Sequence, residues 1–162
     1  MASSLLLALA CAAPEPQSPA SPLAAGVRIL PRDRMLEWCQ ATGDPDGACE
    51  DFRTPPADVV ARFDAELAER FAAEGHADLG RRVRTYLRQY WAVWRAGRLE
   101  IVGNFTCRSV LESRIDVDYD TGEDIPPDPE AEWIPVVVDD VGICNVMVGF
   151  PADAPEDVRV TR

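Results

Sequence analysis

The sequence contains no lysine, and its sixteen basic residues are all arginine. The absence of lysine excludes lysine Schiff-base chemistry and the phosphate-binding lysine of a P-loop. The chain also has a single histidine, His76, which excludes a metal site built from several histidines of one chain. Basic residues are outnumbered by 28 acidic ones, giving a net charge of −12, which argues against sequence-independent binding of nucleic acid.

The length and hydrophobic content are those of one globular domain. The chain has 162 residues, of which 47% are hydrophobic. A chain of this length fits a single domain, and this apolar fraction supplies a real core.

The apolar run near the start, Leu5–Ala10, is short. A bilayer-spanning helix needs about 20 residues, so we interpret the run as the end of a secretory signal. It leads into Leu7-Ala8-Leu9-Ala10-Cys11, which resembles the lipobox of bacterial lipoproteins. The resemblance implies cleavage after Ala10, a diacylglycerol on Cys11 and, since Ala12 is not aspartate, sorting to the outer membrane. No basic residue precedes Leu5, which suggests a start codon farther upstream.

The residues after Cys11 predict a tether. Residues 12–26 carry four prolines among alanine, serine and glutamine, with one charged side chain. Such a stretch buries too little surface to fold and remains extended. We therefore divide the chain into a signal-peptide remnant (1–10), a lipidated cysteine with its tether (11–26) and one folded domain (27–162).

Four further cysteines predict two disulfides, because an even number in an exported domain is typical of paired cysteines. We favour Cys39–Cys49, which flanks the turn-rich segment 43–47, and Cys107–Cys144, which would join two strands. No Cys-x-x-Cys pair occurs, so a zinc site is the minor alternative.

Periodicity predicts two helices before a sheet. The first spans Arg32–Gln40, and the second starts with Thr54 as N-cap and stops at Gly75. The second helix carries one apolar stripe, and we place Asp64 with the charged residues on its other faces. The stripe consists of Val60, Phe63, Leu67 and Phe71.

The segment 81–94 fits either a helix or a strand, and we favour a strand that turns at 95–98 into a second strand, 99–107. Further strands are expected at 133–138, 143–150 and 158–160, with a turn at 139–142. Helices followed by an antiparallel meander of four to five strands predict an α+β fold with a cystatin-like or NTF2-like arrangement of layers.

A second resemblance rests on spaced residues in the sheet region. The pattern is similar to that of a family of uncharacterised small exported bacterial proteins, although Val141 stands where that pattern has glycine. The resemblance implies export and brings no activity with it. The residues are Arg88-Gln89-Tyr90, Gly97, Ile101, Asn104, Trp133 and Asp139-Asp140-Val141-Gly142.

One candidate ligand-binding surface joins Arg88 to the aromatic residues Tyr90, Trp91 and Trp94, because arginine beside aromatic rings can bind anions or stack on a partner. Arg81, Arg82 and Arg84 extend this basic cluster. The alternative is that the aromatic residues belong to the core and the arginines pair with acidic residues.

An acidic segment, 112–132, holds nine acidic residues and one arginine. Its alternating carboxylates Asp116, Asp118 and Asp120 are a candidate calcium loop, but the glycine and glutamate of an EF-hand loop are missing, which favours a solvated acidic loop. No other metal site, cofactor or catalytic residue is indicated, and His76 has no recognisable catalytic partner.

These features predict a bacterial cell-envelope protein, lipid-anchored at the outer membrane or on the periplasmic side. We expect a binding or interaction module with an envelope protein as partner, the membrane contacted through the lipid, and no nucleic acid. The alternatives are a small-ligand pocket lined by the aromatic residues and a hydrolase that uses acidic residues.

Overall fold

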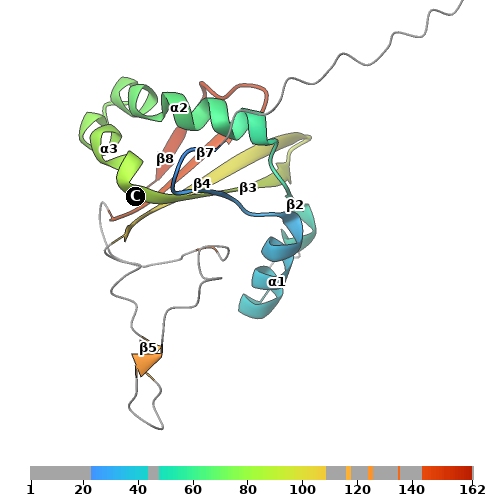
Figure 1. Ribbon diagram of the computed structural model, residues 1–162. Helices are drawn as coiled ribbons and strands as arrows, with labels where there is room; N and C mark the ends of the chain where they lie inside the picture. The colour runs from blue at the N-terminus through green and yellow to red at the C-terminus, as the bar shows by residue number, and fades with distance from the viewer. Residues whose placement is uncertain are drawn as a thin grey trace, which may run out of the picture.

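The computed structural model of the chain describes residues 23–43, 48–108, 116–117, 124–125, 135 and 144–161. Three helices pack on a mixed, mostly antiparallel sheet (Figure 1), so the predicted α+β class is confirmed. The helices are α1 (Arg32–Thr42), α2 (Ala57–Ala73) and α3 (Ala77–Arg82), with short 3-10 turns at Ala48–Asp51 and Val83–Thr85. The strands are β1 (Val27–Ile29), β2 (Phe52–Arg53), β3 (Tyr86–Arg95), β4 (Arg98–Cys107), β5 (Asp116–Val117), β6 (Asp124–Ile125), β7 (Asn145–Pro151) and β8 (Arg159–Thr161).

The main sheet has the strand order β1-β3-β4-β7-β8, with β2 also pairing with β3. Its centre is the hairpin β3–β4, in register from Tyr86 opposite Cys107 to Arg95 opposite Arg98. This confirms the strand interpretation for most of 81–94, although α3 and a 3-10 turn occupy its first five residues. Strands β7 and β8 extend the sheet antiparallel, as predicted. The parallel pairing of β1 with β3 was not predicted. The predicted strand 133–138 and turn 139–142 lie outside the described residues, apart from residue 135.

The helices occupy both faces of the sheet. Helices α2 and α3 lie on one face and α1 lies on the other (Figure 1). The face under α1 contributes Trp91 and Val93 to a small apolar cluster with Met35 and Cys39. Because successive side chains of a strand point to opposite faces, the ten residues of β3 serve both cores at once.

The core between α2 and the sheet confirms the predicted stripe. Its four apolar side chains are at most 1% exposed. The Phe63 ring stacks on that of Phe150, with ring centroids 3.8 Å apart, and meets Tyr90 edge-on at 6.3 Å. Tyr90 in turn lies edge-on to Phe105 at 5.6 Å. The main apolar core is therefore aromatic, and it includes a residue that the sequence analysis assigned to ligand binding.

The predicted role of Thr54 as N-cap of α2 is wrong. Helix α2 begins at Ala57, after Pro56, and no side chain caps it. The Thr54 hydroxyl instead accepts a hydrogen bond from the backbone N–H of Arg32, at 2.9 Å. This N–H opens α1 and has no partner within that helix, so Thr54 caps a helix 22 residues earlier in the chain.

The two disulfides are confirmed in the favoured pairing. Cys39 pairs with Cys49 across a Cα–Cα distance of 5.9 Å, and Cys107 pairs with Cys144 across 4.8 Å. The first bond links α1 to the 3-10 turn that follows it, and the second links the end of β4 to the start of β7.

Candidate binding site

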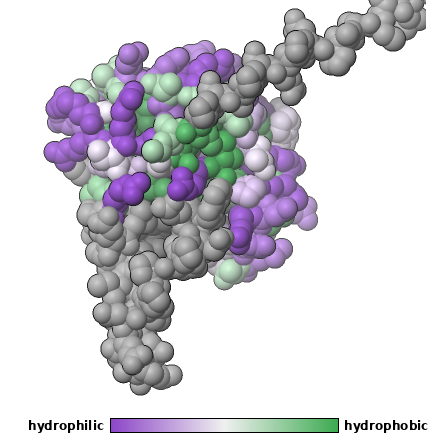
Figure 2. Space-filling model, in the orientation of Figure 1, coloured by the Kyte–Doolittle hydropathy of each residue, from purple (hydrophilic) through white to green (hydrophobic). Residues whose placement is uncertain are grey.

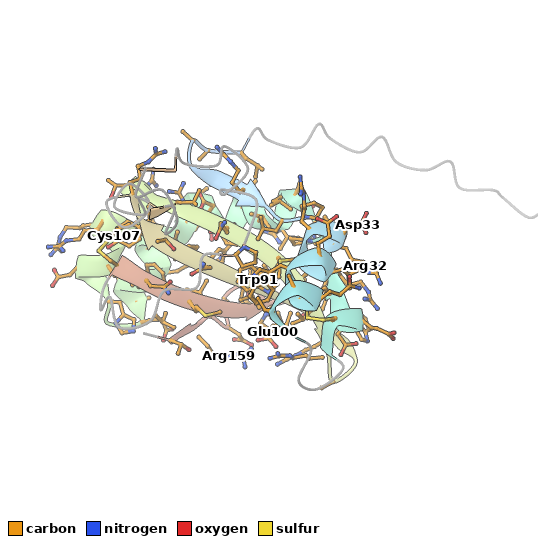
Figure 3. The ribbon with its side chains drawn as sticks, turned by 90° about the horizontal axis from the view of Figure 1, so that it is seen from below. Arg32, Asp33, Trp91, Glu100, Cys107 and Arg159 are labelled. Carbon is orange, nitrogen blue, oxygen red and sulfur yellow. A yellow bond between two sulfur atoms is a disulfide. The ribbon has the colours of Figure 1, made fainter. Side chains whose placement is uncertain are left out.

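The four residues of the predicted ligand-binding surface do not form one surface. Arg88 and Tyr90 point from β3 toward α2, whereas Trp91 points to the opposite face and lies beside α1 (Figure 3). Trp94, near the end of β3, is 46% exposed. The four residues are close together in the sequence, but successive side chains of a strand point to opposite faces of the sheet, which separates them. Because Tyr90 and Trp91 lie on opposite faces of the sheet, these two aromatic residues do not line one common pocket.

Arg88 forms a buried ion pair with Asp64 of α2. Its Nε donates to Asp64 Oδ1 at 2.7 Å and its Nη2 donates to Oδ2 at 3.2 Å. The Tyr90 hydroxyl donates to Asp64 Oδ1 at 2.9 Å. The Arg88 and Asp64 side chains are only 3% and 8% exposed. The placement of Asp64 on a solvated face of α2 is therefore wrong.

The remaining N–H groups of Arg88 are also occupied. They donate to backbone carbonyl oxygens at 3.0 to 3.3 Å, which belong to Ala25, Val83, Arg84 and Tyr86. A guanidinium has five donors and no acceptor. Every donor of Arg88 is thus committed to the protein itself, so this arginine holds α2, β3 and the turn before β1 together and has none left for a ligand.

The same node perturbs Tyr90. Burial, reinforced by the negative charge of Asp64, raises the pKa of the Tyr90 phenol well above its ordinary value. The neutral phenol is the hydrogen-bond donor in this arrangement, since a phenolate would face the Asp64 carboxylate at the same distance. Tyr90 is therefore a structural donor in the core.

The other arginines of the predicted basic cluster differ in what they contact. Arg81 forms an ion pair with Asp78, one turn earlier in α3. Arg84 donates from Nη2 to the backbone oxygen of Ala65 in α2, at 3.3 Å. Arg82 is exposed and forms no ion pair with any residue that the structure describes.

Arg82 lines a pocket formed by the turn after α2, by α3 and by the first residue of β3. The pocket has a volume of about 420 Å³ and is lined by residues 75–79, Arg82 and Tyr86. Volumes of roughly 300 to 1,000 Å³ are typical of small-molecule sites. In Figure 2, hydrophilic side chains dominate the surface at the end of the molecule where Figure 1 places α3.

The turn at Gly75 shapes this pocket. Gly75 has a φ of +81°, in the left-handed region that glycine adopts without strain, and it ends α2 as predicted. The N–H groups of Gly75 and His76 donate to the oxygens of Ala72 and Phe71, at 3.1 and 2.7 Å. These two bonds fix the backbone of His76 against the last turn of α2, and the half-buried His76 side chain lines the pocket.

A close approach of α3 to α2 sets the other wall. A Cβ atom on Gly80 would lie 2.7 Å from the backbone oxygen of Ala68, closer than side chains allow. Only glycine lets α3 pack at this distance. The position of Arg82, two residues later, therefore depends on the contact at Gly80.

A second cavity, of about 410 Å³, lies where β8 meets the end of α2, and it differs in charge. Arg98 and Arg159 line it together with Glu74, Glu156 and Asp157. Arg159 is further engaged in an ion pair with Glu100, the two labelled side by side in Figure 3. Its two arginines are outnumbered by three carboxylates, so it offers no excess of positive charge.

The sheet face opposite α2 carries an amide pair. The Asn104 Nδ2 donates to Gln89 Oε1 at 3.3 Å, and both residues are at most 3% exposed. Both belong to the spaced pattern of the sequence. Their burial assigns them to the interior of the domain.

Of the other predicted site residues, Cys11, Asp118 and Asp120 lie outside the described residues, and of Asp116 the structure describes only its place in β5. Within the described ranges, no group of three or more histidine, cysteine or acidic side chains could hold a metal ion. Sequence reasoning missed the pocket at α3, whose only signal was a histidine after the terminating glycine, followed by an arginine pair.

Comparison with known proteins adds no relative. No family model, no curated protein and no solved structure matches the chain.

Proposed function

We propose that the protein is a bacterial cell-envelope lipoprotein, attached through a lipid on Cys11 at the outer membrane or on the periplasmic side. Its folded domain acts as a binding module for an envelope component. The single observation that carries this proposal is the combination of two disulfides in the domain with a lipobox-like segment ahead of it.

The disulfides support the compartment. Cysteine pairs of this kind persist in oxidising surroundings such as the periplasm and are rare in the cytosol. Cys39 and Cys49 are at most 7% exposed, so the pair is part of the core beside α1 rather than an accessible redox couple. Two such bonds are therefore consistent with a domain that is exported from the cytosol.

The tether supports the anchor. Eleven residues separate Cys11 from Leu23, where the described domain begins. An extended chain of that length reaches at most about 40 Å, enough to keep the domain near a membrane without embedding it. The described residues include no helix that is both long and apolar enough to cross a bilayer.

Binding is favoured over catalysis by how the polar residues are used. The buried Arg88, Asp64 and Tyr90 bond to one another and to the backbone. The pocket beside α3, in contrast, is lined by an exposed arginine, Arg82. The net charge of −12 argues against nucleic acid as the partner. The pocket also favours the second candidate, a small-ligand binder, over a hydrolase.

Metabolic labelling with an alkyne fatty acid in a bacterial host tests the anchor. We expect the wild-type protein to carry label and to partition into detergent, and Cys11→Ser to do neither. Ser18→Ala, in the same tether, is the control and should behave as wild type. Equal labelling of wild type and Cys11→Ser, or no label on either, would contradict the proposal.

A further inference from the structure

We propose that the Cys107–Cys144 disulfide is a thiol–disulfide exchange site, which a dithiol oxidoreductase of the cell envelope opens and closes while the domain stays folded. Both disulfides are formed in the resting protein, and only this one exchanges with a partner. The inference goes beyond the proposed function, because it requires the two disulfide bonds but not the lipid on Cys11.

The two disulfides differ in burial. Cys39 and Cys49 are 7% and 5% exposed and belong to the apolar cluster between α1 and the sheet. Cys107 and Cys144 are half-buried, and Cys107 packs against the main core from a partly exposed position. Figure 3 shows Cys107 at the end of the sheet that lies away from α1. Exchange requires a thiolate to reach a sulfur atom, so a partner reaches the second bond in the folded protein and the first bond only after local unfolding.

The sheet holds the two cysteines of the exposed bond in place. Thr106 lies opposite Asn145 in the last pair of the β4–β7 ladder, so Cys107 and Cys144 face each other one step beyond it, with Cα atoms 4.8 Å apart. This separation is typical of residues directly opposite each other in antiparallel strands. Seven residue pairs of the ladder remain when the bond is open. The two thiols therefore stay opposite each other after reduction, and the same bond can form again.

The exchange transfers two electrons from the partner to the domain. One thiolate of the partner attacks Sγ of Cys107 or Cys144, the Sγ–Sγ bond breaks, and the other cysteine leaves as a thiolate. The partner's second thiolate then attacks the mixed disulfide, so the partner leaves with a disulfide of its own. The two protons of the partner's dithiol end on Cys107 and Cys144, and the oxidised partner closes the bond by the reverse steps.

Opening this bond affects one end of the sheet. Tyr86 lies opposite Cys107 on β3 and also lines the pocket beside α3. Reduction should therefore loosen the strands next to this pocket, whereas the cluster under α1 keeps its own disulfide. The redox state of the bond is thus coupled to one wall of the pocket.

Timed reduction of the full-length Cys11→Ser chain tests the difference in access. Dithiothreitol is added without denaturant, samples are alkylated with iodoacetamide at intervals, and the peptides are quantified by mass spectrometry. Cys107 and Cys144 should be alkylated at least about tenfold faster than Cys39 and Cys49, because the buried pair must wait for local unfolding. In a denaturing concentration of guanidinium chloride this preference should largely disappear. Equal rates in the folded protein, or a preference that persists unchanged in denaturant, would overturn the inference.

A trapping experiment tests the class of partner. Thioredoxin whose second active-site cysteine is replaced by serine can attack a disulfide but cannot resolve the mixed disulfide that results. It should be trapped on Cys107 or Cys144 of the folded chain, as identified by peptide mass spectrometry. The Cys107→Ser/Cys144→Ser variant, shown to be folded by near-ultraviolet circular dichroism, is the matched control and should trap none. Trapping on Cys39 or Cys49, or no trapping on either chain, would overturn the inference.

Failure of this inference and failure of the proposed function give different results. Free thiols in the native protein would contradict the proposed compartment. Two formed disulfides that are reduced at equal rates would leave the compartment in place and contradict only the exchange site.

Discussion

Replacing Asp64 by asparagine removes the negative half of the buried ion pair and leaves the rest of the side chain in place. The Arg88 guanidinium then keeps its bonds to backbone carbonyls but loses its counter-charge. Both side chains are less than 10% exposed, so water cannot compensate for the loss. Breaking a buried pair in this way costs about 3 to 5 kcal/mol, because an uncompensated charge stays inside the protein.

The measurements are the free energy of unfolding, from urea denaturation, and Tm, from thermal unfolding, both followed by circular dichroism. For a domain of this size each kcal/mol lowers Tm by roughly 3 °C, so Asp64→Asn should lower Tm by about 10 to 15 °C. Glu66→Gln, on the same helix, is the matched control. Glu66 pairs with Arg70 at the surface and is about half exposed, so its loss should cost less than about 1 kcal/mol.

The reasoning is refuted if the two variants lose the same small amount of stability. That result would mean that Arg88 is held by its carbonyl partners alone and that Asp64 adds nothing. A larger loss for Asp64→Asn, with an unchanged fold by near-ultraviolet circular dichroism, would assign the difference to the buried charge.

The remaining predictions concern the second disulfide and the alkaline limit of stability. Replacing Cys107 and Cys144 together by serine should lower the free energy of unfolding by about 4 kcal/mol, measured by urea denaturation, because the bond closes a loop of about 37 residues; a loss below 1 kcal/mol would contradict the pairing. Because the pKa of Tyr90 is raised in the folded state, the contribution of its neutral phenol to the free energy of unfolding is fully present below pH 10. Above pH 10 this contribution declines, by at most about 1.4 kcal/mol per pH unit. Denaturation of wild type and Tyr90→Phe between pH 9 and 11 checks this, and parallel pH profiles for the two proteins would contradict it.

The parts of the fold with a clear period were predictable. The stripe of α2 recurs at helical spacing, and the aromatic, β-branched run of β3 followed by a glycine turn indicates a hairpin. The cysteine pairing followed from a turn between Cys39 and Cys49 and from strands on either side of the other pair. For the helix, the hairpin and the first disulfide the signal is local, so neighbouring residues suffice to predict them.

The buried charge was not predictable from local pattern. Asp64 lies four residues after Val60 and three before Leu67, which is a core position by helical spacing. A carboxylate is nevertheless expected to face water unless it is paired. Its partner, Arg88, is 24 residues away on another element, and only the packing of α2 on β3 brings the two together.

The elements that shape the pocket at α3 and the start of α1 could not be predicted from local sequence patterns either. Thr54 was assigned to the helix that follows it, because the contact with Arg32 depends on how α1 returns to the start of α2. Strand β1 has three residues, too few for a periodic signal, and α3 has six. The pocket at α3 depends on the contact of Gly80 with Ala68, which is a tertiary contact.

Export to an oxidising compartment is the claim on which the proposed function depends, and mass spectrometry of the native protein tests it directly. Alkylation without reduction should leave Cys39, Cys49, Cys107 and Cys144 unmodified and yield two cross-linked peptide pairs, with a mature chain that begins at an acylated Cys11. Four alkylated thiols and an unmodified Cys11 would contradict the account and place the protein in a reducing compartment.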